Sequence, residues 1–190
     1  MSSTFITKEK LISYKTNIET LTTNYWFDKD VLEKISINLL SNAVKYTPES
    51  GTIECNAFIK NNQLHFEVKN SGKGMTKDEI EKVFNRFYQI REDNKGTGIG
   101  LALVKELVTL HKGTINVESI PNNWTTFAIK LPITKKAFKE DEITIHAESN
   151  ELTKKETNYI DTIETGIIII DNSSIDEDKP ILLIVDDLKI

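Results

Sequence analysis

Three alternating glycines, Gly96, Gly98 and Gly100, lead straight into a segment with helical periodicity. Apolar residues recur through that segment near the spacing of one helix face: Leu101, Val104, Leu107, Val108 and Leu110. Glycines let a ligand approach the backbone closely, and the first turn of a helix offers unpaired N–H groups. The stretch predicts either a phosphate-binding loop or a glycine-rich loop that merely begins a helix.

The spacing excludes two common phosphate loops. A dinucleotide fingerprint needs G-x-G-x-x-G after an apolar strand, whereas here G-x-G-x-G follows a mostly polar stretch from Asn85 to Lys95. The Walker sequence G-x-x-x-x-G-K-[ST] is absent, and so are the catalytic triplets of protein kinases. Gln89 to Lys95, the polar residues directly before the glycines, are expected to form a mobile cover.

The charge of the chain is unevenly distributed. Residues 1–138 hold 19 basic and 15 acidic side chains, a net charge of +4, whereas residues 139–179 hold 4 and 12, a net charge of −8. A slightly basic body suits a small polyanionic ligand but is too weakly charged to indicate nucleic-acid binding. The acidic stretch loses periodicity, which predicts a linker over residues 135–179.

The single cysteine, Cys55, excludes an internal disulfide and a cysteine-cluster metal site. Its neighbours alternate as in a strand, so a buried, inert thiol is expected. The longest apolar run, Ile181 to Val185, is too short to cross a membrane. These features predict a soluble, cytoplasmic chain that makes no direct membrane contact.

Helix signals recur along the body of the chain. Asp28 is positioned to cap a helix over residues 31–46. Thr76 with Glu79 predicts a capping box for a short second helix, and Gly113 is expected to end the helix after the glycine loop.

Strand signals fill the intervals. Residues 52–69 and 115–131 alternate apolar and polar side chains around asparagine turns, so both are predicted to be β-hairpins. Residues 18–27 have a strand-like composition. Near the end, residues 181–185 predict a buried parallel strand that is followed by Asp186 and Asp187.

A polar stripe runs along the predicted helix over residues 31–46. Asn38, Asn42 and Lys45 lie at i, i+4 and i+7, on a face separate from the apolar one. Asparagine is a poor helix former, so two of them one turn apart in a helix interior are unusual. Taken as an isolated pair, they favour a solvated face over a binding role.

Four motifs then occur in order: residues 38–47, residues 70–74, residues 84–88 and residues 96–100. Together they closely resemble the N, G1, F and G2 boxes of the ATP-binding catalytic domain of sensor histidine kinases, in the gyrase-type (GHKL) ATPase superfamily. Each motif is weak alone, whereas the ordered set is highly specific. The resemblance implies an α/β fold, a two-layer sandwich with a mixed sheet covered by helices on one face. It also implies a protein-histidine kinase catalytic domain over residues 1–134.

The resemblance assigns ATP and Mg2+ as the ligands and gives each matching residue a role. Asn42 is the expected metal ligand, since a hard cation prefers oxygen donors. The expected catalytic positions are Asn38, Lys45, Arg86 and Arg91. The expected nucleotide-binding positions are Asn42, Tyr46, Asn70, Gly72, Gly74, Gly96, Thr97, Gly98, Ile99, Gly100, Leu101 and Thr125.

Four residues differ from those that related ATPases usually carry. Asn38 occupies the place where gyrase-type ATPases carry a glutamate base; an amide cannot accept a proton, which favours transfer over hydrolysis. Asn70 replaces the aspartate that usually binds the adenine amine, and its carbonyl oxygen can still accept that hydrogen bond. Asn123 and Trp124 stand where the family often has glycine, which affects the expected turn.

The acceptor of the phosphoryl group is missing from the motif set. His65, His111 and His146 all lack the histidine–carboxylate context on a long helix that the family uses. The resemblance therefore implies a separate histidine-containing dimerisation domain as partner and a membrane-anchored parent. Residues 180–190 resemble the first strand of a receiver domain. The alternatives are a non-catalytic nucleotide-binding or docking module, which Asn70 favours, and a gyrase-like hydrolase.

Overall fold

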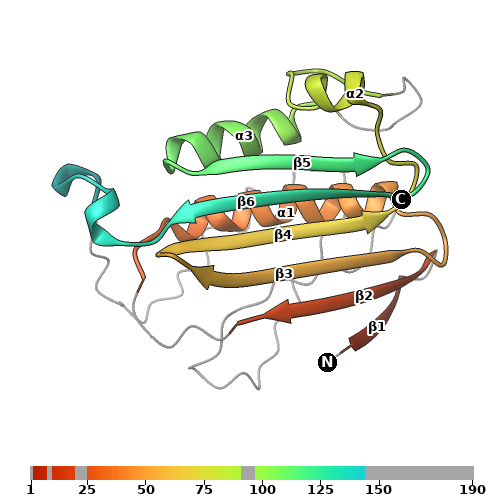
Figure 1. Cartoon of the computed structure of the whole chain (residues 1–190), viewed down its shortest axis with the longest axis horizontal. Helices are drawn as coiled ribbons and strands as arrows, with labels where there is room; N and C mark the ends of the chain where they lie inside the picture. Colours follow the sequence, from red (N-terminus) through yellow and green to blue (C-terminus); the bar gives the residue numbers. More distant parts are fainter. Residues whose placement is uncertain (1, 8–9, 20–24, 91–96, 144–190) are drawn as a thin grey trace, which may run out of the picture.

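Six strands form one mixed sheet in the order β1-β2-β3-β4-β6-β5 (Figure 1). In this computed structural model of the 190-residue chain, the described residues are 2–7, 10–19, 25–90 and 97–143. The strands are β1 (Ser2–Thr7), β2 (Lys10–Ile18), β3 (Thr52–Lys60), β4 (Gln63–Ser71), β5 (Thr114–Ile120) and β6 (Trp124–Pro132). β2 and β3 pair in parallel, whereas every other pair of neighbours is antiparallel.

The helices lie on one side of this sheet. A parallel strand pair needs a crossover, and α1 (Lys29–Tyr46) supplies it between β2 and β3. α3 (Gly100–Leu110) packs beside α1, and the short α2 (Lys77–Lys82) lies near one end of β5 (Figure 1). None of the helices in the described ranges is long and apolar enough to cross a membrane.

Local sequence explains where two of these helices begin. The Asp28 carboxylate accepts hydrogen bonds from the N–H groups of Asp30 at 2.9 Å and Val31 at 3.1 Å, so it caps α1 as predicted. Thr76 and Glu79 form the predicted capping box of α2.

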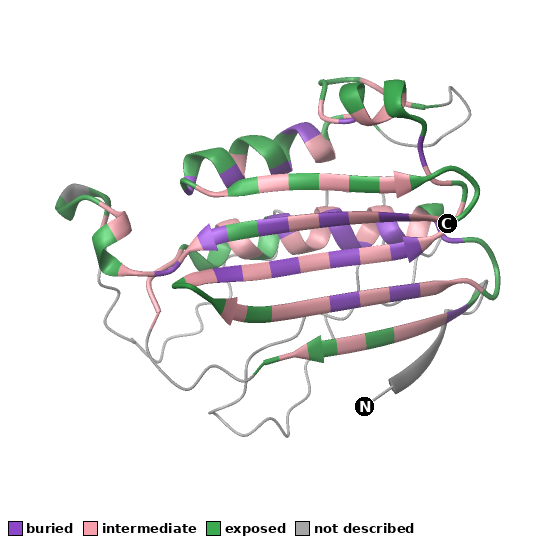
Figure 2. Cartoon of the chain, viewed as in Figure 1, coloured by how far each residue is buried: buried purple, intermediate pink, exposed green. Residues whose placement is uncertain are grey.

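Alternating burial along β4 and β6 separates the helix-facing side of the sheet from the opposite side (Figure 2). The two predicted hairpins are confirmed as β3–β4 and β5–β6. Burying an apolar side chain stabilises the fold by about 1.5–3 kcal/mol, so this single core carries most of the stability. Its most buried members are Ile35, Leu39, Ile53, Cys55, Val68, Val104, Val108, Ile129 and Leu131.

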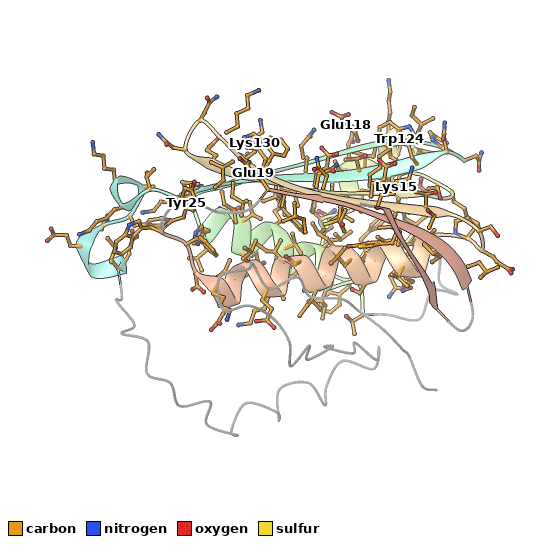
Figure 3. The ribbon with its side chains drawn as sticks, turned by 90° about the horizontal axis from the view of Figure 1, so that it is seen from below. Lys15, Glu19, Tyr25, Glu118, Trp124 and Lys130 are labelled. Atoms are coloured by element: carbon orange, nitrogen blue, oxygen red, sulfur yellow. The ribbon has the colours of Figure 1, made fainter. Side chains whose placement is uncertain are left out.

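No helix of the described ranges covers the opposite side of the sheet (Figure 3). Glu118, Trp124 and Lys130 stand on that side in Figure 3, with α1 and α3 below the sheet. The chain is therefore a two-layer α/β sandwich with a mixed sheet, as predicted.

Two local predictions were wrong. The strand near the N-terminus is β2, whereas Tyr25, Trp26 and Phe27 have no regular structure. Those three aromatic residues lead into the cap of α1, and the N–H of Trp26 donates to the Ile133 carbonyl at 3.0 Å. Aromatic composition was mistaken for a strand because buried loop anchors have the same composition.

The second difference is at the end of α3, where Gly113 was expected to terminate the helix but Lys112 is the residue in the left-handed conformation. Lys112 has a φ of 56°, and the N–H of Gly113 donates to the Val108 carbonyl at 2.8 Å. Gly113 is needed for packing, because a Cβ there would lie 2.5 Å from the Lys130 carbonyl oxygen.

The described structure continues past residue 134. Short 3-10 turns at Lys135–Ala137 and Glu140–Glu142 fold back onto the end of α3, where Lys112 Nζ donates to the Ala137 carbonyl at 3.0 Å. Residues 144–190, which hold most of the predicted linker and the receiver-like strand, lie outside the described residues.

Candidate functional site

The polar stripe of α1 faces the start of α3. Asn38 Nδ2 donates to the Lys34 carbonyl at 2.7 Å, which leaves Oδ1 as the free end of the amide. A Cβ added to Gly100 would lie 2.7 Å from that oxygen, so Asn38 contacts the first residue of α3. Glycine at this position therefore lets the two helices meet at a polar contact.

The glycine loop supplies a helix start without a cap. Ile99 occupies the N-cap of α3 and makes no side-chain cap hydrogen bond. Gly98 has a φ of 68°, and its carbonyl accepts from the N–H of Phe87 at 2.9 Å. Uncapped N–H groups at the positive end of a helix dipole bind anions. This observation favours the phosphate-loop interpretation over a mere helix start.

A second glycine loop follows β4 and packs against the end of α1. A Cβ at Gly72 would lie 2.6 Å from the Tyr46 carbonyl oxygen, and one at Gly74 would overlap the Ile120 carbonyl. The N–H of Gly72 donates to the Asn123 carbonyl at 3.0 Å. Both glycines are therefore needed because other backbone approaches closely.

Asn70, near the end of β4, and Thr125, near the start of β6, lie side by side. They are cross-strand partners on the helix-facing side of the sheet, with exposed fractions of 7% and 8%. Asn70 Nδ2 donates to the Ser71 carbonyl at 2.9 Å. Its Oδ1 has no hydrogen-bond partner among the described residues. Asn70 and Thr125, which would form the floor of a nucleotide pocket and are called the pocket floor below, therefore present an unpaired acceptor.

The last residues of α1 follow Asn38, which contacts Gly100, and run to the helix end that packs against Gly72. Burial lowers the pKa of Lys45 and raises the pKa of Tyr46. The Lys45 ammonium lies 5.2 Å from the centre of the Tyr46 ring. The side chain of the half-buried Asn42, one turn earlier, makes no hydrogen bond to any residue in the described ranges.

Arg86 pairs with Glu106 of α3 and makes no hydrogen bond or ion pair with the described residues of this stripe. Arg86 Nη2 lies 2.6 Å from Glu106 Oε1, and its Nε donates to the same oxygen at 3.1 Å. Both side chains are more than half exposed and line an open groove of about 510 Å³ along α3, together with Leu110. Arg91 and Gly96 lie outside the described residues.

The remaining predicted positions follow the loop. Thr97 and Ile99 are exposed at the glycine loop, and Leu101 is half-buried in the first turn of α3. No group of three or more His, Cys, Asp or Glu side chains that could hold a metal ion is found among the described residues. A cation at this site would need oxygens from a ligand in addition to Asn42.

One residue at the site was missed by sequence reasoning. Ser119 of β5 accepts a hydrogen bond from the N–H of Met75, in the second glycine loop, at 2.8 Å. It also lies 2.8 Å from Thr125 Oγ1. The inward position in a strand was readable, but the pairing that brings Ser119 to the loop was not.

The family described as histidine kinase-, DNA gyrase B- and HSP90-like ATPase matches residues 27–135. Histidine kinase P4 of Formosa agariphila is 32% identical over 178 residues, 87% of this chain and 13% of that protein. Sensor histidine kinase WalK of Bacillus subtilis is 35% identical over 133 residues, 67% of this chain and 22% of that protein. The chain spans less than a quarter of the length of either relative.

Solved structures give the same result for the fold. Full-length ShkA in complex with AMPPNP superposes with a TM-score of 0.60 at 26% identity, covering 67% of this chain and 27% of that chain. The nucleotide-free catalytic domain of histidine kinase ThkA gives 0.59 at 25% identity, covering 67% of this chain and 82% of that chain. The chain therefore belongs to the histidine kinase-, DNA gyrase B- and HSP90-like ATPase family, and its body is an ATP-binding catalytic domain of the histidine-kinase type.

Proposed function

We propose that this chain binds Mg-ATP and transfers the γ-phosphoryl group to a histidine on a separate dimerisation domain. Its family membership supports nucleotide binding, as does the AMPPNP that accompanies the related ShkA in its structure. The observation that carries the proposal is the junction of α1 with the start of α3, where an amide stripe faces uncapped N–H groups.

The roles follow from the chemistry of each side chain. Asn42 is the proposed magnesium ligand, since an amide oxygen without another partner suits a hard cation. The ion, when bound, would neutralise phosphate charge. Lys45 would add a positive charge beside the phosphates, and the N–H groups at Gly98 and Gly100 would hold phosphate oxygens.

Asn38 argues for transfer to a histidine over hydrolysis. Its amide contacts the start of α3, and an amide has no basic lone pair that accepts a proton near neutral pH. Water in this place would lack a general base. Hydrolysis is therefore expected to be slow, and a stronger nucleophile must be supplied.

The two described histidines do not meet that need. His65 stacks on Phe58 with ring centroids 4.9 Å apart, on a strand. His111 is buried against Phe138 at the far end of α3. We therefore assign the acceptor, as part of this proposal, to another domain. A downstream receiver, a membrane-anchored parent and a cytoplasmic location stay predictions.

The arginine roles also stay predictions. Arg86 is ion-paired with Glu106, so a part in phosphoryl transfer requires that it exchange the carboxylate for phosphate oxygens. Both partners are exposed, and such pairs contribute only about 0–1 kcal/mol, which makes the exchange inexpensive.

The runner-up is a docking or nucleotide-binding module without catalysis. Its main support, Asn70 in place of aspartate, is weakened because Asn70 is only 7% exposed and its Oδ1 is an acceptor without a partner among the described residues. A surface that only docked a protein would have no need of one.

The test is labelling with γ-radiolabelled ATP. The chain alone is expected to bind ATP yet incorporate no label, because phosphoryl transfer depends mainly on positioning an acceptor that it lacks. Adding the histidine-bearing helical hairpin of a parent kinase should restore acid-labile labelling of the hairpin. Acid-stable labelling of the chain alone, or rapid hydrolysis without the hairpin, would contradict the proposal.

A further inference from the structure

Ser119 sits at the meeting point of three elements of the site. Its hydroxyl oxygen accepts from the Met75 N–H at 2.8 Å, and it donates to the Trp124 carbonyl at 2.8 Å. The Thr125 hydroxyl lies 2.8 Å away on its third side, and Thr125 is also the cross-strand partner of Ser119. Ser119 thus joins the second glycine loop to the pocket floor.

The single hydroxyl hydrogen of Ser119 determines whether the Thr125 hydroxyl is a donor or an acceptor toward a ligand. A serine hydroxyl has one hydrogen, and the Trp124 carbonyl can only accept, so that contact consumes the hydrogen. The contact between the two hydroxyls then needs Thr125 as donor. Thr125 has no second hydrogen, and its oxygen is left with lone pairs only.

Hydrogen bonding also fixes the orientation of the neighbouring Asn70 amide. Asn70 Nδ2 is held by the Ser71 carbonyl at 2.9 Å; the flipped amide would bring two acceptors together there. Asn70 Oδ1 is therefore the exposed end of that group. Asn70 and Thr125 are register partners, so the floor presents two adjacent acceptors.

We propose that Ser119 is a positioning residue that locks the Thr125 hydroxyl as an acceptor and so makes the pocket floor select a 6-amino purine over a 6-oxo purine. This role rests on the function proposed above. The exocyclic amine of a 6-amino purine can donate hydrogens to Asn70 Oδ1 and Thr125 Oγ1. The oxygen of a 6-oxo purine can only accept, so it would face two other acceptors. A buried acceptor that faces another acceptor loses its hydrogen bond outright.

The experiment measures dissociation constants of ATP and inosine triphosphate with magnesium, since the two nucleotides differ at the 6-position. The chain should bind ATP at least about 100-fold more tightly, in line with sites built to hydrogen-bond a substrate group. Ser119→Ala frees the Thr125 hydroxyl to donate to the 6-oxo group. The ratio of the two constants should then fall at least about tenfold, while Ser119→Thr, which keeps a hydroxyl, should retain it.

A matched control separates this role from simple loosening of the loop. Thr76→Ala removes the cap of α2, which follows the same loop, without touching Thr125. It should weaken both nucleotides equally and leave the ratio unchanged. If Ser119→Ala does not fold, Ser119→Cys replaces it, because a thiol is a poor acceptor for the Thr125 hydroxyl and the ratio should fall there as well.

The outcomes are distinct. A folded Ser119→Ala or Ser119→Cys variant with the wild-type ratio overturns the role of Ser119 and leaves the proposed function standing. A wild-type chain that binds neither nucleotide overturns the proposed function itself, and the role of Ser119 with it.

Discussion

The two ends of the site are built in different ways. The base end, Asn70 with Thr125 and Ser119, stands on three neighbouring strands, and its donors are satisfied by hydrogen bonds of 2.8 to 2.9 Å. The phosphate end, Asn42 with Lys45 and the start of α3, stands on two helices, and Asn42 is without a hydrogen-bond partner in the described ranges. At the base end the protein satisfies its own donors and leaves acceptors for the ligand, whereas at the phosphate end the ligand's charges must supply partners for the polar groups. Changes at the base end should therefore alter stability and selectivity, and changes at the phosphate end should alter binding alone.

The largest expected effect is at the phosphate end. Asn42→Ala removes the proposed magnesium ligand, so ATP should bind about 100-fold more weakly, a loss of about 2.7 kcal/mol. The magnesium dependence of binding should disappear with it. Isothermal titration with and without magnesium measures both, and the free energy of unfolding should stay within about 0.5 kcal/mol of wild type.

Asn17→Ala, an exposed position on β2 away from the site, is the matched control and should change neither quantity. Unchanged ATP binding by Asn42→Ala would show that Asn42 is not part of the site. It would also contradict the expectation that changes at the phosphate end alter binding.

A substitution beside the base end should act mainly on stability. Gly74 has a φ of 58°, and a Cβ there would overlap the Ile120 carbonyl, so Gly74→Ala should lower the free energy of unfolding by about 2 kcal/mol. Gly100→Ala is the counterpart at the phosphate end. Its Cβ would meet only the Asn38 side chain, so stability should be kept while ATP binding weakens. Urea denaturation followed by ATP titration compares the two variants; equal losses of stability would contradict the contrast.

Sequence reasoning reached the phosphate end more easily than the base end. Asn38, Asn42 and Lys45 share one helix, where a fixed period of 3.6 residues places them on one face. The base end depends on strands distant in sequence, and only the register shows that Ser119 faces Thr125 and Thr125 faces Asn70. The family motifs supplied Asn70 and Thr125 individually, whereas Ser119 belonged to no motif. The ion pair of Arg86 with Glu106 was also beyond sequence, since it joins residues on different elements.

The next largest effect is at Asn70, where one substitution should strengthen ATP binding and lower the free energy of unfolding. Asn70→Asp should tighten ATP binding by up to about tenfold, or ~1.4 kcal/mol, because the hydrogen bond to the base amine becomes charge-assisted. It also removes the donor to the Ser71 carbonyl, so the free energy of unfolding should fall by about 1 kcal/mol. Asn17→Asp adds the same charge elsewhere and controls for net charge. Weaker ATP binding by Asn70→Asp would show that the Asn70 amide donates to the ligand, which would contradict its role as an acceptor for the base amine.

The smallest effect concerns His111, at the end of α3 opposite the glycine loop. Burial is the main cause that lowers its pKa; the Asp28 carboxylate opposes the shift and the Lys112 ammonium adds to it. The ring packs on Phe138, and its Nε2 is buried without a partner.

Because the folded-state pKa of His111 lies below the unfolded value of about 6.5, the unfolded chain binds this proton more readily. Stability from this group is therefore full above about pH 6.5 and is lost as the pH falls toward the folded-state pKa. His111→Leu should flatten the decline of the melting temperature between pH 7 and pH 5, as measured by circular dichroism. ATP affinity at pH 7.5 should be unchanged, since the substitution lies away from both ends of the site. A wild-type slope in His111→Leu would assign the acid sensitivity to other groups, and a loss of ATP affinity would mean that α3 couples its far end to the phosphate loop.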